Sequence, residues 1–266
     1  EFIFTSQWRP TLGRQYHIHV NSTVADGTIV VDTGHPNDLR YADFTTYYSY
    51  LVSDVDYHPI LQTSTGLLVI GNERYVATWD GIEFDNHRLI LSPGYRVRCF
   101  ATWRDYVAIG CWRGSNIYDY DDGRIYFWDC SSDTFNGYID VPEGGVNAMF
   151  GSKGQLHVWA GYQGDHLIYI GGETAEKIKR VPKITTDKYV EIAPGAVTMW
   201  KTLLRYGACL NSSANDIERG VYTWGKLNYN STDILTYDYP ISTGSRGSTV
   251  KIGLLHVVGS KLLIGW

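Results

Sequence analysis

One three-part pattern recurs four times along this sequence of 266 residues. Each copy opens with a short apolar run that closes on glycine, at Gly71, Gly110, Gly161 and Gly207. A second run, rich in β-branched and aromatic residues, follows each glycine, and a third run ends at a proline. The second runs are residues 75–79, 124–128, 166–170 and 220–224, and the third runs end at Pro93, Pro142, Pro182 and Pro240. A fifth copy opens at Ile252 and reaches its glycine at Gly265.

These runs predict β-strands, because each is short, rich in strand-forming residues and bounded by turn residues. No window of ten or more residues carries a helical apolar period. The pairs Asp80-Gly81, Asp122-Gly123 and Lys153-Gly154 lie where adjacent strands should reverse. Successive glycines are 39 residues apart at the closest (71 to 110) and 58 at most (207 to 265). A unit of this size cannot bury both faces of its sheet, so copies must stack.

The sequence therefore predicts an all-β fold: a β-propeller with four clear blades, a degenerate N-terminal blade and the start of a further blade at the C-terminus. Residues 1–57 fit the repeat poorly and are interpreted as a degenerate or interrupted first blade. Residues 58–266 form the propeller blades and stop inside the fifth copy. We expect one propeller domain that is part of a longer chain.

Charge and cysteine content exclude several classes of function. A net charge of −5 and a pI near 5.9 argue against a general or sequence-specific nucleic-acid surface. The apolar runs are far shorter than the roughly 20 residues of a membrane-spanning helix, and no signal peptide is recognisable. The four cysteines, Cys99, Cys111, Cys130 and Cys209, are expected to be buried free thiols. Cys111 and Cys130 flank a predicted hairpin, so a disulfide between them is the alternative prediction.

Two long insertions are the predicted contact surface. They cover residues 111–123 and 211–219, and insertions in a repeat protein concentrate on one face, often the binding face. The candidate contact residues are Tyr118, Asp119, Tyr120, Asp121, Asn211 and Asn215.

No motif predicts catalysis. Trp79-Asp80 and Trp128-Asp129 resemble the dipeptide of WD-repeat propellers, but no Gly-His pair opens the blades. The Ser-x-Asp turns at Ser131 and Ser231 lack the glycine of the sialidase-type turn and predict ordinary hairpin turns. A glycosidase needs two carboxyl groups roughly 5 to 9.5 Å apart. The conceivable acids are Asp54, Asp56, Asp165 and Glu173, each of which could equally lie in a solvated turn.

Metal and cofactor sites are not expected either. His17 and His19 would share one face of a strand, but no third ligand is identifiable. The acidic residues 119–122 lack the spacing and distal glutamate of a calcium loop. We therefore expect no catalytic, metal or cofactor residues.

The segment from Gly94 to Gly110, followed by Gly123-Arg124-Ile125-Tyr126-Phe127-Trp128-Asp129 and Ile139-Asp140-Val141-Pro142-Glu143-Gly144, resembles propeller segments of tailed-bacteriophage virion proteins. The resemblance extends over roughly residues 58–266 and consists of the recurring order of strand, Gly, aromatic-Trp-Asp and Pro-Glu-Gly. In that group, propellers occur in the tail nozzle, as a ring around the DNA channel, and in tail hubs.

The resemblance implies a structural, non-enzymatic docking module of a phage tail, assembled in the bacterial cytoplasm and located in the virion. The implied partners are copies of the chain in a ring and adjacent tail proteins, with a host-surface glycan as a further candidate. Two alternatives remain: a carbohydrate-binding or glycoside-hydrolase-type propeller, and a cellular scaffold propeller. Host, position in the tail, oligomer number and total blade number stay open.

Overall fold

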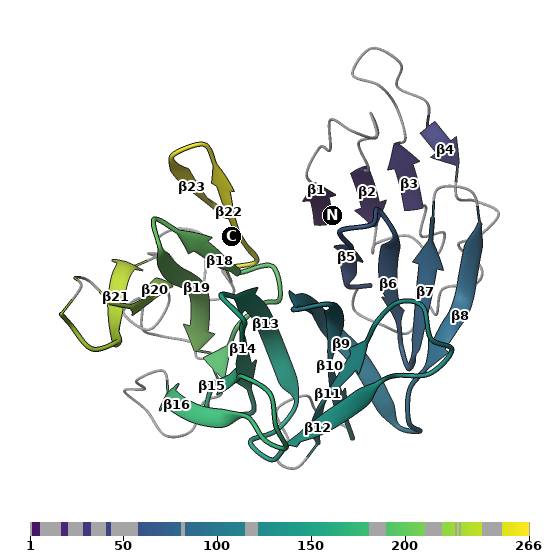
Figure 1. Ribbon diagram of the computed structural model, residues 1–266. Coiled ribbons are helices and arrows are strands. Elements are labelled where there is room, and N and C mark those ends of the chain that lie inside the picture. Colours follow the sequence, from purple (N-terminus) through teal and green to yellow (C-terminus); the bar gives the residue numbers. More distant parts are fainter. Residues whose placement is uncertain are drawn as a thin grey trace. The chain divides into compact units, whose positions relative to one another are not determined.

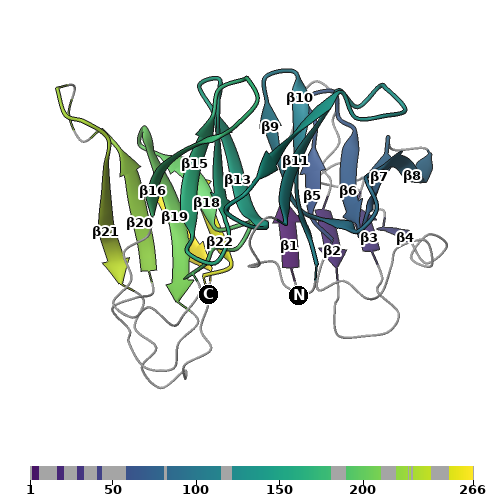
Figure 2. The ribbon, with the colours of Figure 1, turned by 90° about the horizontal axis from the view of Figure 1, so that it is seen from below.

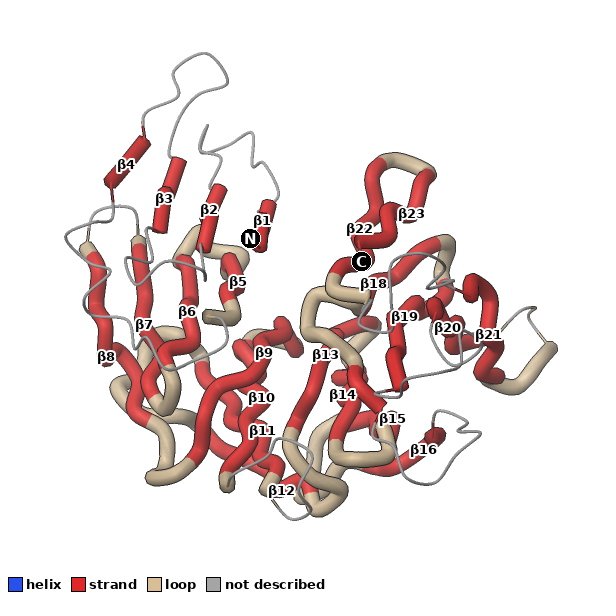
Figure 3. Tube along the Cα trace, turned by 180° about the vertical axis from the view of Figure 1, so that it is seen from behind, coloured by secondary structure: helices blue, strands red, loops and turns tan. Residues whose placement is uncertain are grey.

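The computed structural model describes residues 2–5, 17–20, 29–32, 41–43, 58–80, 83–114, 122–180, 190–210, 220–226, 228, 230–240 and 252–265. Within these ranges all regular elements are β-strands (Figure 3). Among the described residues, none belongs to a helix long and apolar enough to cross a membrane. The chain divides into two compact units, Glu1–Val97 and Arg98–Trp266.

The first unit contains two four-stranded antiparallel sheets, each ordered as its strands follow in the chain. One sheet comprises β1 (Phe2–Thr5), β2 (His17–Val20), β3 (Ile29–Asp32) and β4 (Tyr41–Asp43). The other comprises β5 (Ile60–Gln62), β6 (Leu68–Asn72), β7 (Tyr75–Trp79) and β8 (Phe84–Ile90). The assignment of residues 1–57 to a degenerate blade stays a prediction.

The second unit contains four successive antiparallel sheets (Figure 1). The first is β9 (Tyr95–Trp103), in which the unit boundary falls, β10 (Tyr106–Arg113), β11 (Gly123–Trp128) and β12 (Gly137–Val141). The second is β13 (Val146–Ser152), β14 (Gln155–Ala160), β15 (Asp165–Tyr169) and β16 (Glu176–Arg180). The third is β17 (Val190–Glu191), β18 (Val197–Trp200), β19 (Leu203–Leu210), β20 (Gly220–Gly225) and β21 (Ile234–Pro240), where β17 and β18 both pair with β19. The fourth is the hairpin of β22 (Leu254–Val258) and β23 (Lys261–Gly265).

Apolar cores lie between these successive sheets. The sheets stack side by side in the second unit (Figure 2). Val146 and Met149 of β13 pack with Cys99 and Ile125 of the preceding sheet. Each sheet thus covers a face that its neighbour would otherwise expose, as the repeat length requires. The predicted all-β propeller class is confirmed.

The repeated pattern corresponds to the second, third and fourth strands of the four sheets that begin with β5, β9, β13 and β18. Of the first strands, β5 overlaps the segment His58-Pro59-Ile60-Leu61, which was predicted to open the first clear blade, whereas β9, β13 and β18 were not predicted as part of the repeat. In the second unit each first strand joins the second through a two-residue loop, such as Arg104-Asp105 or Lys201-Thr202. Arg104 and Lys201 have positive φ angles of 53° and 49°. Neither of these two loops contains a glycine, so the sequence carries no hairpin signal there, whereas the glycine of Lys153-Gly154 marks that turn.

Strand register shows which glycines are equivalent. Leu68, Val107 and Leu204 each pair with a tryptophan of the third strand, which is the last residue of β7 and β11 and the last but one of β20. Three residues after each of them come Gly71, Gly110 and Gly207, so these three glycines occupy one structural position, as predicted. Gly265 is the fifth residue of β23, as Gly110 is of β10 and Gly207 is of β19.

The predicted equivalence of Gly161 is wrong by two residues. In its sheet Leu156 pairs with Tyr169, and the residue three positions on is Trp159. Gly161 follows the end of β14 and has a φ of +69°, with the Glu143 carbonyl where a Cβ would project. Gly161 is therefore required by a turn, whereas Gly71, Gly110 and Gly207 are required by close packing.

The equivalent glycines allow close approach of neighbouring segments. A Cβ at Gly110 would lie 2.6 Å from Val146 Cγ1 in the next sheet, and a Cβ at Gly207 would lie 2.4 Å from Ile252 Cγ2. Both distances are too short for packed carbon atoms, and both neighbours are β-branched and stiff.

Gly207→Ala is therefore expected to lower the free energy of unfolding by about 1–3 kcal/mol, the usual cost of overpacking. Gly137→Ala is the matched control, because a Cβ there meets nothing within 4 Å and φ is not positive. Urea denaturation of both variants measures the difference. Equal stability of the two variants would contradict the close approach at Gly207.

Candidate functional site: a cleft between two sheets

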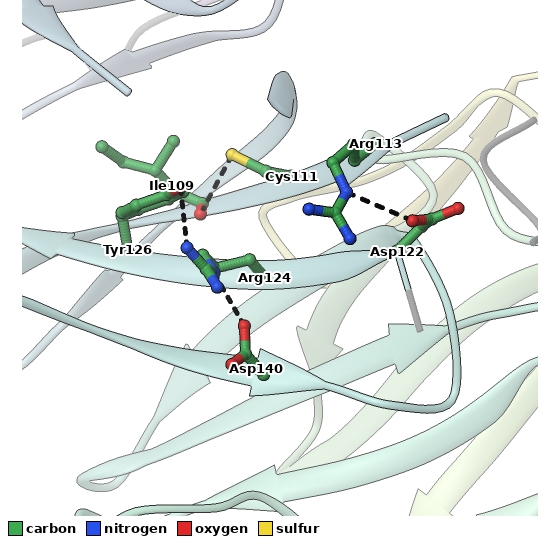
Figure 4. Close-up of polar contacts among 7 residues, drawn as sticks. All are labelled: Ile109, Cys111, Arg113, Asp122, Arg124, Tyr126 and Asp140. Carbon is green, nitrogen blue, oxygen red and sulfur yellow. Dashed lines mark hydrogen bonds and ion pairs between the residues drawn. The ribbon is translucent and has the colours of Figure 1, made fainter. Parts of the chain in front are cut away.

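The predicted contact residues lie outside the described part of the chain. Residues 115–121 and 211–219 contain all six of them, namely Tyr118, Asp119, Tyr120, Asp121, Asn211 and Asn215. The base of the first insertion is described: Arg113 N–H donates to the Asp122 carbonyl at 2.8 Å. Arg113 Nε also contacts Asp122 Oδ1 at 3.4 Å (Figure 4). Both predicted contact loops therefore stay predictions.

An aromatic and charged surface lies beside this base on β11 and β12. Arg124 Nε donates to Asp140 Oδ1 at 2.7 Å (Figure 4). The Arg124 guanidinium also lies 4.0 Å from the centre of the Tyr138 ring, which is 49% exposed. Such an exposed ring with a fixed cation next to it is suited to protein contact.

The acids considered for catalysis are not brought together among the described residues. Asp165 is buried and accepts two hydrogen bonds from Arg180, at 2.7 and 3.2 Å, while Lys177 Nζ lies 3.5 Å away. Glu173 is exposed. Asp54 and Asp56 lie outside the described residues. Asp165 thus has a structural ion-pair role.

Asp129 of the second Trp-Asp pair stabilises a turn through its side-chain hydrogen bonds. Asp129 accepts hydrogen bonds from the backbone N–H groups of Ser131 and Ser132, from the Ser132 hydroxyl and from Asn136 Nδ2, all at 2.8–2.9 Å. These bonds, led by that of the Ser132 N–H, lower the pKa of Asp129 below its ordinary range. The Ser-x-Asp turn at Ser131 is therefore organised by Asp129, as a hairpin turn.

All four cysteines are free thiols, and Cys99, Cys111 and Cys209 are buried. The prediction of free thiols is confirmed, although Cys130 is only half-buried. Burial raises the pKa of Cys99 to about 12 and also raises the pKa of Cys111 well above its ordinary value. Thiols in this state are poor nucleophiles.

The described residues contain no group of three or more His, Cys, Asp or Glu side chains arranged to hold a metal ion. His17 and His19 are on β2, where their backbones pair with Thr5 and Ile3 of β1. The proposed metal pair is thus placed on a strand, and its ligation stays untested.

A cleft of about 860 Å³ lies between the β13–β16 sheet and the β18–β21 sheet, and no sequence motif indicated it. Its volume falls in the range typical of ligand sites. Apolar and aromatic side chains contributed by both sheets include Ile168, Met199, Leu204 and Trp224. Polar lining residues are Ser152, Lys153, Gln155, Thr202, Lys226, Asn228 and Asp233, together with His157.

Two buried histidines extend from this cleft into the core between the sheets. His157 Nδ1 lies 3.0 Å from His166 Nε2, so one imidazole donates to the other. His166 stacks on Trp159, with ring centres 4.6 Å apart and planes 11° apart. Among the described residues, His166 Nδ1 has no hydrogen-bond partner.

Burial keeps both histidines neutral at pH 7. It lowers the pKa of His157 to about 4, opposed by the nearby Asp233 carboxylate. Burial and the neighbouring His157 also lower the pKa of His166 well below its ordinary value. The cleft therefore offers a neutral imidazole edge, a tryptophan face and two lysines, a combination that can bind a ring-containing ligand.

No protein-family model matches this sequence, and no curated protein sequence is similar to it. Solved structures do match. A prolyl endopeptidase is 12% identical with a TM-score of 0.51 over 91% of this chain and 36% of that one. YCF48 from Cyanidioschyzon merolae is 11% identical with a TM-score of 0.50 over 78% of this chain and 63% of that one.

The β-propeller domain of Cps50 (Swd1) from Myceliophteria thermophila is a third match, 13% identical with a TM-score of 0.46 over 78% of this chain and 62% of that one. The chain thus spans less than two thirds of each of these structures. At these identities the comparisons show the fold and no activity. The chain has a β-propeller fold.

Proposed function

We propose that this chain is a non-enzymatic docking module of a bacteriophage tail, where copies form a ring and contact adjacent tail proteins. The resemblance of residues 94–144 to tail propeller segments carries the proposal. In a symmetric ring, one patch on each subunit meets a different patch on the next. The module is a virion component assembled in the bacterial cytoplasm.

The β22–β23 hairpin supports a role in protein contact. Leu254, Val258 and Leu263 on this hairpin are 40%, 54% and 48% exposed. Exposed apolar side chains that cluster on one element call for a covering segment, which is either the further strands expected of this blade or a partner chain. Tyr138 near the first insertion adds an exposed aromatic ring.

The cleft is the observation that supports the alternative of a carbohydrate-binding or glycoside-hydrolase propeller, because Trp224 and its polar neighbours suit a sugar ring. A glycan array and a chromogenic glycoside screen test it. We expect neither binding nor hydrolysis. If the chain hydrolyses a glycoside and a single Asp→Ala or Glu→Ala substitution abolishes this activity, the chain is an enzyme and the docking proposal is wrong.

A further inference from the structure

A tryptophan joins neighbouring sheets at two places in the second unit. Trp103 ends β9, and its indole N–H donates to the Gly154 carbonyl at 2.9 Å. Trp200 ends β18, and its indole N–H donates to the Ser260 carbonyl at 3.1 Å. In both cases the acceptor is the second residue of the two-residue loop that follows the first strand of the next sheet. The two contacts are therefore equivalent.

A cation lies over each of these indole rings. The Arg104 guanidinium is 4.4 Å from the centre of the Trp103 ring, and the Lys201 ammonium is 4.5 Å from that of Trp200. Both cations come from the first residue of the loop after the tryptophan. The repeated unit is thus an indole with a cation on its face and a carbonyl at its N–H.

The β13–β16 sheet lacks this tryptophan. Its first strand ends at Ser152, whose side chain is far too small to reach the next sheet. Lys153 follows at the cation position, exposed and without an ion pair or ring contact among the described residues. Thr202 is the loop residue at the acceptor position. Ser152, Lys153 and Thr202 all line the cleft.

The sheet separation is maintained from deeper in the junction. Trp159 occupies the position of Gly110 and Gly207, and its ring packs against Tyr206 at 5.0 Å. At this junction the tryptophan ring comes from the second strand, whereas at the other two junctions it comes from the end of the first strand. The cleft lies where the other two junctions hold their indole.

We propose that this cleft receives a tryptophan side chain from a partner polypeptide. The indole N–H would donate to the Thr202 carbonyl, the Lys153 ammonium would lie on the ring face, and Met199 and Trp224 would form apolar walls. The lysines at positions 153 and 226 outnumber Asp233 in the lining, which favours a partner segment with acidic residues beside the tryptophan. This inference deepens the proposed docking function and rests on it.

The test uses fluorine NMR on the full chain with a capped Glu-Trp-Glu peptide that carries 5-fluorotryptophan, and a capped Glu-Leu-Glu peptide as competitor. We expect saturable binding that the leucine peptide does not displace. Ser152→Trp should weaken binding at least about tenfold, because the new indole fills the site. Gly137→Trp, the matched control, adds an indole on β12 outside the cleft lining, where a Cβ meets nothing within 4 Å, and should leave the affinity unchanged.

Lys153→Met keeps the cleft open and should weaken binding about two- to fivefold, the effect of losing one cation–π contact. This variant keeps the proposal falsifiable if Ser152→Trp does not fold. Equal binding of the two peptides, or unchanged affinity in both variants, would overturn the inference. Binding of an oligosaccharide that Ser152→Trp abolishes, without binding of the tryptophan peptide, would assign the cleft to a sugar.

The peptide assay does not depend on the virion. If the tryptophan peptide binds the isolated chain but phage particles lack the chain, the cleft proposal stands and the assignment to a phage tail is wrong. If the chain is present in the tail but does not bind the peptide, the tail assignment stands and the cleft proposal is wrong.

Discussion

Asp238→Ala is expected to lower the free energy of unfolding by about 3–5 kcal/mol, because it leaves a buried arginine unpaired. Arg205 is only 7% exposed, and its guanidinium forms an ion pair with Asp238. Thr223 and Thr236 also donate hydroxyl hydrogen bonds to the same carboxylate. Burial alone would raise the pKa of Asp238, but these hydrogen bonds and Arg205 lower it overall.

Urea denaturation of three variants at pH 7 tests this expectation. Asp122→Ala removes the acid paired with Arg113, whose side chain is 49% exposed against 8% for that of Arg205, and it should cost less than about 1 kcal/mol. Arg205→Met combined with Asp238→Ala should recover much of the loss, because no charge remains buried. If Asp238→Ala and Asp122→Ala cost the same, the Arg205 ion pair has no special role in stability.

Acidification from pH 7 to pH 4 is expected to lower the free energy of unfolding by about 3 kcal/mol through His157, with His166 adding to the loss. The pKa of His157 falls from an ordinary 6.5 to about 4 in the folded chain, and that difference corresponds to about 3 kcal/mol. Between these values the unfolded chain binds more protons, so stability falls as pH falls. Asp129 and Asp238 affect stability in a lower pH range. Because their pKa values are lowered in the folded chain, they stabilise it above pH 3.8, and this stabilisation is lost as the pH falls below that value.

Urea denaturation at pH 7, 6, 5 and 4 measures this dependence. Replacing His157 by Leu and His166 by Phe together should flatten the curve above pH 4, since neither residue can then take up a proton. His256→Gln is the matched control, because His256 is exposed on β22, and it should leave the slope unchanged. A double variant with the slope of the unmodified chain would contradict the buried, neutral state of the pair.

The strands that carry apolar and aromatic residues could be predicted from the sequence. Residues 75–79 coincide with β7, and the runs ending at Pro142 and Pro240 lie on β12 and β21. The first strands β9 and β18 could not be predicted, because the loops that follow them, Arg104-Asp105 and Lys201-Thr202, contain no glycine to mark a hairpin. The false equivalence of Gly161 arose because a turn glycine and a close-packing glycine look alike in sequence.

The cleft could not be predicted at all. Its lining comes from the β13–β14 loop, the β18–β19 loop and the turn before β21, which are distant in sequence. The one available signal was Ser152 at the place of Trp103 and Trp200, and it becomes visible only when the first strands are aligned. The WD-like pair Trp128-Asp129 drew attention to a turn that Asp129 stabilises.

Electron microscopy of phage particles that encode this chain, labelled with an antibody fragment raised against it, tests the central claim most directly. The docking proposal predicts label in a ring around the tail axis, with several copies of the chain at equal spacing. Unlabelled particles, with the chain recovered as a free monomer that binds a glycan, would contradict it.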